Sequence, residues 1–229
     1  MRISIVGIGR MGRVLAARLA ETAELTLYDA DTERAAEVAA VVGARAAVSL
    51  EDAAQAEAVI LALPDQEVIA CLSKLNLVPR TSLTVINIAT NLARTTFAAA
   101  AAPHIRCVSA KFVGHAAEMA AGARPVIIVD NADPELTELA ATLFAGVGDV
   151  LTGDSDWVAA INTIAAEKAL EAAVLIEERL RYRGFADPAI AKSAIGQVAA
   201  GIIKAYAVDD LGPFARKVVN SVREKLAGR

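Results

Sequence analysis

Three glycines near the amino terminus have the spacing of a phosphate-binding loop. Gly7, Gly9 and Gly12 form the pattern G-x-G-x-x-G, directly after a short β-branched run and before a helical pattern. In that setting the first glycine permits a tight turn, the second lets the backbone approach a pyrophosphate, and the third permits close helix packing. Free N–H groups at Arg10 and Met11 would point at the phosphates. The pattern predicts a dinucleotide site, and the alternative is a glycine-rich turn without a ligand.

An acidic residue stands at the end of the next strand pattern. The run 24–28 is followed by Asp29, about where a carboxylate accepts hydrogen bonds from the hydroxyls of the adenosine ribose. The same carboxylate would repel a 2′-phosphate, so Asp29 favours NAD over NADP. Arg34 lies just downstream and could turn toward a 2′-phosphate, or it could be an ordinary solvated arginine on a helix surface. We therefore expect NAD as the cofactor and leave NADP open.

Buried strands and helices alternate after the glycine loop. The run 58–63 is apolar throughout, as in a parallel sheet that is covered on both faces, and 83–88 is expected to be the next buried strand. Ligands of such sheets bind beyond the carboxyl ends of the strands. Leu63, Pro64 and Thr90 would then lie on one rim with the glycine loop, where they either contact the cofactor or serve only as connections.

The expected fold class is α/β, with a Rossmann-type, doubly wound, mostly parallel sheet followed by an all-α domain. The composition changes at residues 152–156, which divides the chain into a dinucleotide-binding domain, 1–152, and a helical dimerisation and substrate domain, 153–229. Helices expected at 157–183 and 187–208 are apolar almost all round. They cannot bury all of these faces among themselves, so we expect a homodimer through the carboxy-terminal helices.

Composition excludes several classes of function. The 229 residues carry a net charge of −4 with 22% charged residues, and they offer no basic stripe for a nucleic acid. Long apolar stretches and signal-peptide patterns are absent from the sequence, which favours a cytoplasmic protein without membrane attachment. Cys71 and Cys107 occupy apolar contexts without metal-ligand spacing, and the chain has only two histidines. We expect reduced thiols and no metal site.

With these parts in order, the chain resembles the pyrroline-5-carboxylate reductase and 6-phosphogluconate dehydrogenase-like superfamily. In the first half, the glycine loop and the run 59–64 carry the resemblance. In the second half, it is carried by 175–180, 183–188 and 195–201. The resemblance implies an NAD(P)-dependent oxidoreductase that forms intertwined dimers. It implies hydride transfer to a small imine or ketone, as in pyrroline-5-carboxylate reductases or prephenate dehydrogenases.

The expected catalytic loop departs from these families. The reductase motif Arg-x-Met-Pro-Asn is replaced by 110–114, and its Ser-Pro-Gly-Gly stretch is missing. Of the prephenate dehydrogenase motif His-Pro-Met-x-Gly, only Gly114 is present, and Lys111 stands one residue after the position of the histidine. Asn162 matches the asparagine of the Lys-x-x-x-Asn pair in related hydroxyacid dehydrogenases, but Val158 stands at the lysine position.

Hydride transfer to a C=O or C=N bond needs a group that stabilises the charge developing on the acceptor. A strand expected at 105–110 leads into Lys111 and His115, and Asn162 lies on the first carboxy-terminal helix. We take these three as candidate catalytic residues in a cleft between the two domains. The alternatives are that Lys111 is a solvated loop lysine, that His115 makes a hydrogen bond at a helix start, and that Asn162 makes an intersubunit hydrogen bond.

Three functions are consistent with the sequence. The first is an oxidoreductase for a small imine or ketone. The second is a dinucleotide-binding sensor or assembly protein without turnover, which the missing family motifs suggest. The third is a deazaflavin (F420)-dependent NADP reductase, which resembles the amino-terminal half but fits Asp29 poorly.

Overall fold

The computed structural model describes residues 1–228, and the chain divides into two compact units, Met1–Thr163 and Ile164–Arg229. The eight-stranded sheet, described next, lies wholly in the first unit and ends at Gly153. Helix α8 (Trp157–Tyr182) follows the sheet, and its first two turns belong to the first unit. The division expected at residue 152 thus coincides with the end of the sheet, and whether it bounds a functional domain stays a prediction.

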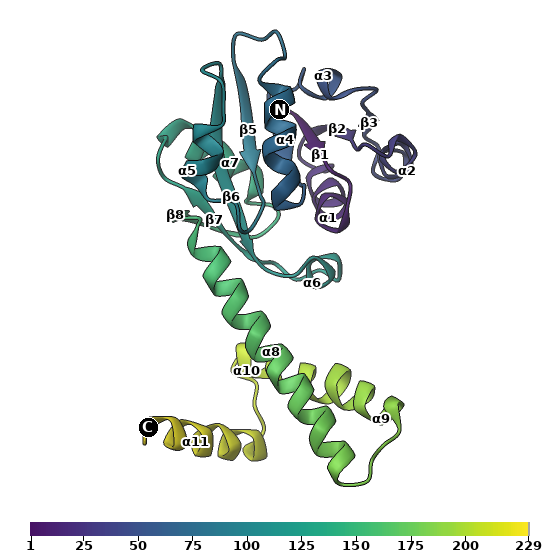
Figure 1. The fold of residues 1–229 in the computed structure, drawn as a ribbon, viewed down its shortest axis with the longest axis vertical. Coiled ribbons are helices and arrows are strands. Elements are labelled where there is room, and N and C mark those ends of the chain that lie inside the picture. The colour runs from purple at the N-terminus through teal and green to yellow at the C-terminus, as the bar shows by residue number, and fades with distance from the viewer. Residues whose placement is uncertain (229) are drawn as a thin grey trace. The chain divides into compact units, whose positions relative to one another are not determined.

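The sheet has the order β3-β2-β1-β4-β5-β6-β7-β8 (Figure 1). Its strands are β1 (Arg2–Val6), β2 (Glu24–Tyr28), β3 (Arg45–Ala46), β4 (Ala58–Leu61), β5 (Leu83–Asn87), β6 (Ile105–Val113), β7 (Val126–Asp130) and β8 (Asp149–Gly153). All neighbouring strands are parallel except β6 and β7, which pair antiparallel. The predicted doubly wound, mostly parallel sheet is confirmed.

Helices cover both faces of the sheet. One face packs against α1 (Arg10–Leu19), α2 (Thr32–Val42), α6 (Ala116–Ala120) and α7 (Pro134–Phe144). The other face packs against α3 (Leu50–Ala53), α4 (Asp65–Leu75) and α5 (Arg94–Ala99). Every residue of β4 and β5 is buried as a result. This is why β4 is apolar without alternation, whereas β5 also buries the polar side chains of Thr84 and Asn87.

Capping residues fix several helix ends. Asp31 caps α2 by accepting a hydrogen bond from the backbone N–H of Arg34. Gly43 ends the same helix with φ 72°, a left-handed conformation that favours glycine. Asp133 accepts hydrogen bonds from two backbone N–H groups at the start of α7. These ends depend on local chemistry and are therefore legible in the sequence.

Other boundaries differ from expectation. Strand β6 continues three residues past Ala110, because residues 110–113 pair with β7. Lys111 therefore belongs to a strand and not to a loop. The six-residue helix α5 is not predicted from the sequence, and of the five-residue helix α6 only a start at His115 is suggested. Helices this short do not show an apolar period.

The second unit consists of helices. After the main part of α8 come α9 (Pro188–Ser193), a π-helical segment (Ala194–Ala199), α10 (Ala200–Ala207) and α11 (Pro213–Ala227). The single helix expected over 187–208 is therefore interrupted by a π-helical segment. Large apolar side chains remain exposed on each main helix, including Leu170, Val174, Leu175, Val198, Ile202, Ile203, Phe214 and Val222. Across residues 1–228, none of the helices combines the length and apolarity needed to cross a membrane.

Candidate functional site

The glycine loop connects β1 to α1, and packing requires two of its glycines. Gly7 has φ 95°, and a Cβ there would lie 2.6 Å from the carbonyl oxygen of Ala62. A Cβ on Gly12 would lie 1.9 Å from the carbonyl oxygen of Gly7. Both substitutions would force the backbone to move, so these two glycines shape the loop whether or not a ligand binds.

Gly9 is different, because packing does not explain it. A Cβ on Gly9 would have no atom within 4 Å among the described residues, so the space beside it is open. Gly9 is also the N-cap residue of α1, and this helix start has no side-chain capping hydrogen bond within residues 1–228. Arg10 and Met11 follow Gly9 in the first turn of α1, where backbone N–H groups have no partner within the helix and therefore suit an anion. The residues present fit a pyrophosphate.

Asp29 links the end of β2 to the glycine loop. Its side chain is largely buried and accepts a hydrogen bond from the Ile8 N–H to Oδ2 at 2.6 Å. Its Oδ1 accepts a second one from the Asp31 N–H at 2.9 Å, and the Arg34 guanidinium lies 3.4 Å from the same oxygen. Asp29 thus holds the loop that would carry the phosphates. Sequence reasoning expected only its contact with the ribose.

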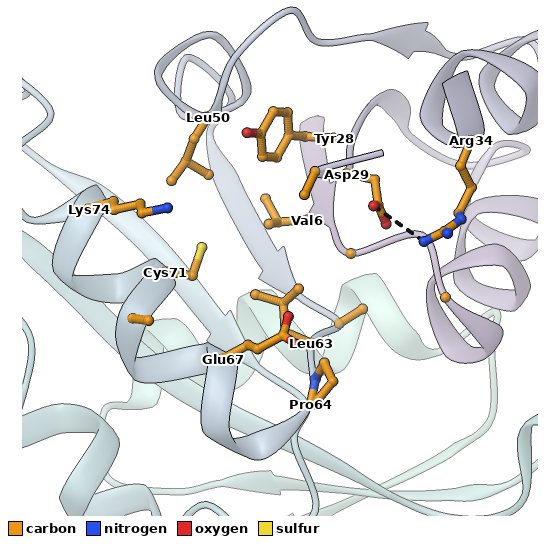
Figure 2. A pocket seen from close by; sticks show the side chains of 15 residues that line it. Val6, Tyr28, Asp29, Arg34, Leu50, Leu63, Pro64, Glu67, Cys71 and Lys74 are labelled. Carbon is orange, nitrogen blue, oxygen red and sulfur yellow. Dashed lines mark hydrogen bonds and ion pairs between the residues drawn. The ribbon is translucent and has the colours of Figure 1, made fainter. Parts of the chain in front are cut away.

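An open cavity of about 420 Å³ begins at the glycine loop. Figure 2 shows its walls, where Cys71 and Lys74 point from α4 toward Leu50 and Tyr28. The lining residues are Val6, Gly7, Gly9, Tyr28, Asp29, Ala30, Arg34, Leu50, Ala62, Leu63, Pro64, Glu67, Ala70, Cys71 and Lys74. The size and the mixture of apolar walls with a few charged groups suit a small-molecule site. Five of the nine predicted cofactor residues line the cavity, namely Gly7, Gly9, Asp29, Leu63 and Pro64.

The loops after β4 and β5 are tied together at the carboxyl edge of the sheet. Asp65 accepts hydrogen bonds from the backbone N–H of Asn91 at 3.1 Å and from its side-chain amide at 2.8 Å. Thr90 precedes Asn91 and is half-buried, but it is not among the residues that line the cavity. The loops after β4 and β5 thus lie side by side at this edge, and Thr90 is next to the Asn91–Asp65 contact that joins them.

Lys111 is buried in an ion pair. Its side chain is 1% exposed, and Nζ lies 2.6 Å from Asp156 Oδ1 and donates a hydrogen bond to the Leu92 carbonyl at 2.8 Å. Asp156 also accepts the backbone N–H of Arg94 at 3.1 Å. The solvated loop lysine that the sequence left open is wrong. Sequence reasoning missed Asp156, which it treated only as part of a domain boundary.

The other two candidate residues are placed differently. Asn162 donates a hydrogen bond from Nδ2 to the carbonyl of Phe112 at 2.9 Å, which joins the first turns of α8 to β6. His115 is exposed and precedes α6, and its side chain makes no capping hydrogen bond to that helix within the described residues. Lys111 and Asn162 are therefore both anchored at the end of β6, and His115 lies two residues beyond it.

Neither cysteine is a reactive thiolate near neutral pH. Burial raises the pKa of the Cys71 thiol to about 11, although the charge of Lys74 opposes this shift. Burial also raises the pKa of Cys107 to about 12. Both are free thiols, and Cys71 is the one that lines the cavity.

Comparisons with known proteins agree on the fold. A family model described as NADP oxidoreductase, coenzyme F420-dependent, matches residues 2–91, which contain the glycine loop and Asp29. No curated protein sequence matches the chain.

Solved structures match almost the whole chain. A pyrroline-5-carboxylate reductase from Streptococcus pyogenes is 18% identical, with 97% of this chain and 85% of that chain covered and a TM-score of 0.70. An imine reductase from Pseudomonas sp. is 19% identical, with 91% and 78% covered and a TM-score of 0.64. A reductive aminase from Aspergillus terreus, in complex with NADPH4, cyclohexanone and allyl amine, is 18% identical, with 96% and 77% covered and a TM-score of 0.65. The chain therefore has the fold of these enzymes, and the resemblance inferred from its motifs is confirmed at that level.

Proposed function

We propose that the protein is an NAD(P)-dependent oxidoreductase that transfers hydride between a nicotinamide cofactor and a small imine or ketone. The observation that carries the proposal is Gly9, which has open space beside it, stands at the N-cap position of a helix start without a side-chain cap, and borders the cavity. The names of the matching family and structures support the same chemistry.

The cofactor would be held by residues of the first unit. The N–H groups of Arg10 and Met11 would bind the pyrophosphate beside Gly9. Asp29 would accept the ribose hydroxyls, and Leu63, Pro64 and Thr90 would contact the rest of the cofactor along the rim. When bound, the nicotinamide supplies or accepts the hydride.

We propose NAD as the preferred cofactor, because the Asp29 carboxylate would meet a 2′-phosphate with like charge. Arg34 is the feature that keeps NADP open, since it lines the same cavity.

Lys111, His115 and Asn162 are the proposed substrate-binding donors. Lys111 uses two of its three N–H groups for Leu92 and Asp156, and its positive charge would stabilise developing negative charge on an acceptor. Asn162 donates through Nδ2 to Phe112, which fixes the direction of its amide. His115 is exposed, and its ring nitrogens can donate or accept a hydrogen bond.

We also propose a homodimer through helices of residues 153–229. The exposed apolar side chains of α8, α10 and α11 support this, because soluble proteins rarely leave so much apolar surface uncovered. A second copy of the chain offers the same apolar helices, so the contact would be self-complementary.

The test starts with binding. NADH fluorescence should change on titration with the protein, and Gly9→Val should abolish the change while leaving the far-UV circular dichroism and unfolding midpoint intact. Gly153→Val is the matched control, because its Cβ also meets no atom within 4 Å of the described residues but lies at the end of β8. NADH oxidation is then followed with cyclic imines and 2-oxo acids. Failure of the wild-type protein to bind either nicotinamide cofactor would refute the proposal.

A sensor or assembly protein without turnover is the second candidate function. It is favoured by the pairing of Lys111 with Asp156, which occupies the lysine that chemistry would need. Cofactor binding without oxidation of NADH by any imine or ketone would support this candidate. An F420-dependent NADP reductase, suggested by the name of the matching family, would instead show deazaflavin reduction by NADPH.

A further inference from the structure

Arg34 lies between two carboxylates at the cavity edge. Its Nη2 is 2.9 Å from Asp31 Oδ2. Its Nη1 is 3.4 Å from Asp29 Oδ1, a contact that Figure 2 shows as a dashed line. The two acids differ in their other duties. Asp29 is committed to the backbone of the glycine loop, whereas Oδ2 of Asp31 is bonded to Arg34.

We propose that Asp31 is a specificity-determining residue: by pairing with Arg34, it sets how strongly the site disfavours the 2′-phosphate of NADPH. This inference rests on the proposed dinucleotide function. It concerns a residue that follows the ribose-binding position by two and lies outside the set lining the cavity.

The electrostatics of the turn support this role. Residues 29–34 hold three acids, Asp29, Asp31 and Glu33, and one base, Arg34. A 2′-phosphate adds further negative charge and would need the guanidinium as its partner. While Arg34 is paired with Asp31, its charge is neutralised, and the approaching phosphate meets the remaining acids.

The pair can also be broken at small cost. The side chains of Arg34 and Asp31 are 41% and 47% exposed, and ion pairs exposed to this degree contribute little to stability. Asp31 therefore acts as a competitor for Arg34 and not as a permanent lock. Removing its charge should release the guanidinium for a phosphate without harming the fold.

The decisive variant is Asp31→Asn. Asparagine is as good an N-cap as aspartate, so the hydrogen bond from the Arg34 N–H to Oδ1 can be kept while the charge is lost. Glu33→Gln is the matched control, because it removes one negative charge from the same exposed turn, and no ion pair joins Glu33 to Arg34 among the described residues. Arg34→Gln, alone and combined with Asp31→Asn, tests whether any gain depends on the guanidinium.

The readout is the dissociation constant of the full-length protein for NADH and for NADPH, measured by fluorescence titration in low salt. We expect Asp31→Asn to tighten NADPH binding about fivefold or more and to change NADH binding less than about twofold. Glu33→Gln should have a clearly smaller effect on NADPH, and the double variant should lose the gain.

Three results would overturn the inference. The ratio of the dissociation constants for NADPH and NADH could be unchanged in Asp31→Asn. NADPH binding could tighten equally in Glu33→Gln, or the tighter NADPH binding could persist when Asp31→Asn is combined with Arg34→Gln. In each case both cofactors still bind, so the proposed function stands. If the folded wild-type protein binds neither cofactor, the proposed function and this inference fail together.

Discussion

The ammonium group of Lys111 lies 2.6 Å from Oδ1 of Asp156, although the two residues are 45 positions apart. The same carboxylate receives the backbone N–H of Arg94 at the start of α5, and Lys111 also binds the Leu92 carbonyl. One buried cation therefore joins β6, the loop after β5 and the residues before α8. Because Leu92 lies two residues after Thr90, this ion pair helps to fix the loop that contains Thr90.

Breaking this pair should destabilise the first unit. Lys111→Met keeps the volume but leaves Asp156 unpaired and the Leu92 carbonyl without its donor. We expect a loss of about 2–4 kcal/mol in the free energy of unfolding, because one partner of the pair is almost fully buried. Urea denaturation followed by circular dichroism measures the loss. Lys168→Met, which removes an exposed pair with Glu171, should leave the midpoint unchanged.

Asp29→Ser should weaken cofactor binding and narrow the preference for NADH. The variant loses the carboxylate that would repel a 2′-phosphate, and it also loses the acceptor that fixes the Ile8 N–H of the glycine loop. We expect about tenfold weaker NADH binding, since hydrogen bonds to charged groups are among the stronger ones. Fluorescence titration with both cofactors checks this, and unchanged NADH affinity would contradict it.

Cys71 should react slowly with iodoacetamide and should be shielded by cofactor. The thiolate is the nucleophile, and burial raises the pKa of Cys71 to about 11, so labelling should stay slow at pH 8 and accelerate as the pH rises toward that value. Because Cys71 lines the cavity, saturating NADH should slow its labelling, whereas Cys107 should not respond. Mass spectrometry of the labelled peptides gives both rates. Equal rates with and without NADH would remove Cys71 from the cofactor site.

Light scattering at micromolar concentration should give about twice the 23.8 kDa chain mass. Leu170→Glu should shift the mass toward the monomer, because Leu170 is one of the exposed apolar residues of α8. Val41→Glu places the same charge at an exposed apolar position of the first unit and should leave the mass unchanged. A wild-type protein that stays monomeric and soluble would contradict the proposed dimer.

Turnover should depend on the proposed donors. Once an acceptor is found, loss of a true catalytic donor costs on the order of 10²-fold in rate. His115→Ala and Asn162→Ala should be compared at saturating NADH, with NADH affinity as the control. Lys111→Ala requires a parallel measurement of folding, since its ion pair is structural as well. Normal turnover and substrate affinity in all three variants would move the chemistry to other residues.

Features that depend on local chemistry could be predicted from the amino-acid sequence alone. The glycine spacing, the acid after β2, the apolar run of β4 and the alternation of strands with helices predicted the doubly wound sheet and its ligand-bearing edge. The helix caps at Asp31 and Asp133 also depend on local sequence, because a side chain that hydrogen-bonds its own helix start needs no distant partner.

The hydrogen bonds and ion pairs of the candidate site depend on contacts between segments that are distant in the sequence. Asp156 reaches Lys111, and Asn162 reaches the carbonyl of Phe112 across 50 residues, because the sheet brings these segments together. The antiparallel pairing of β6 with β7 moved Lys111 from an expected loop into a strand. Strand direction and ion-pair partners are settled by which distant segments can be buried together, and neither composition nor spacing along one chain records that choice.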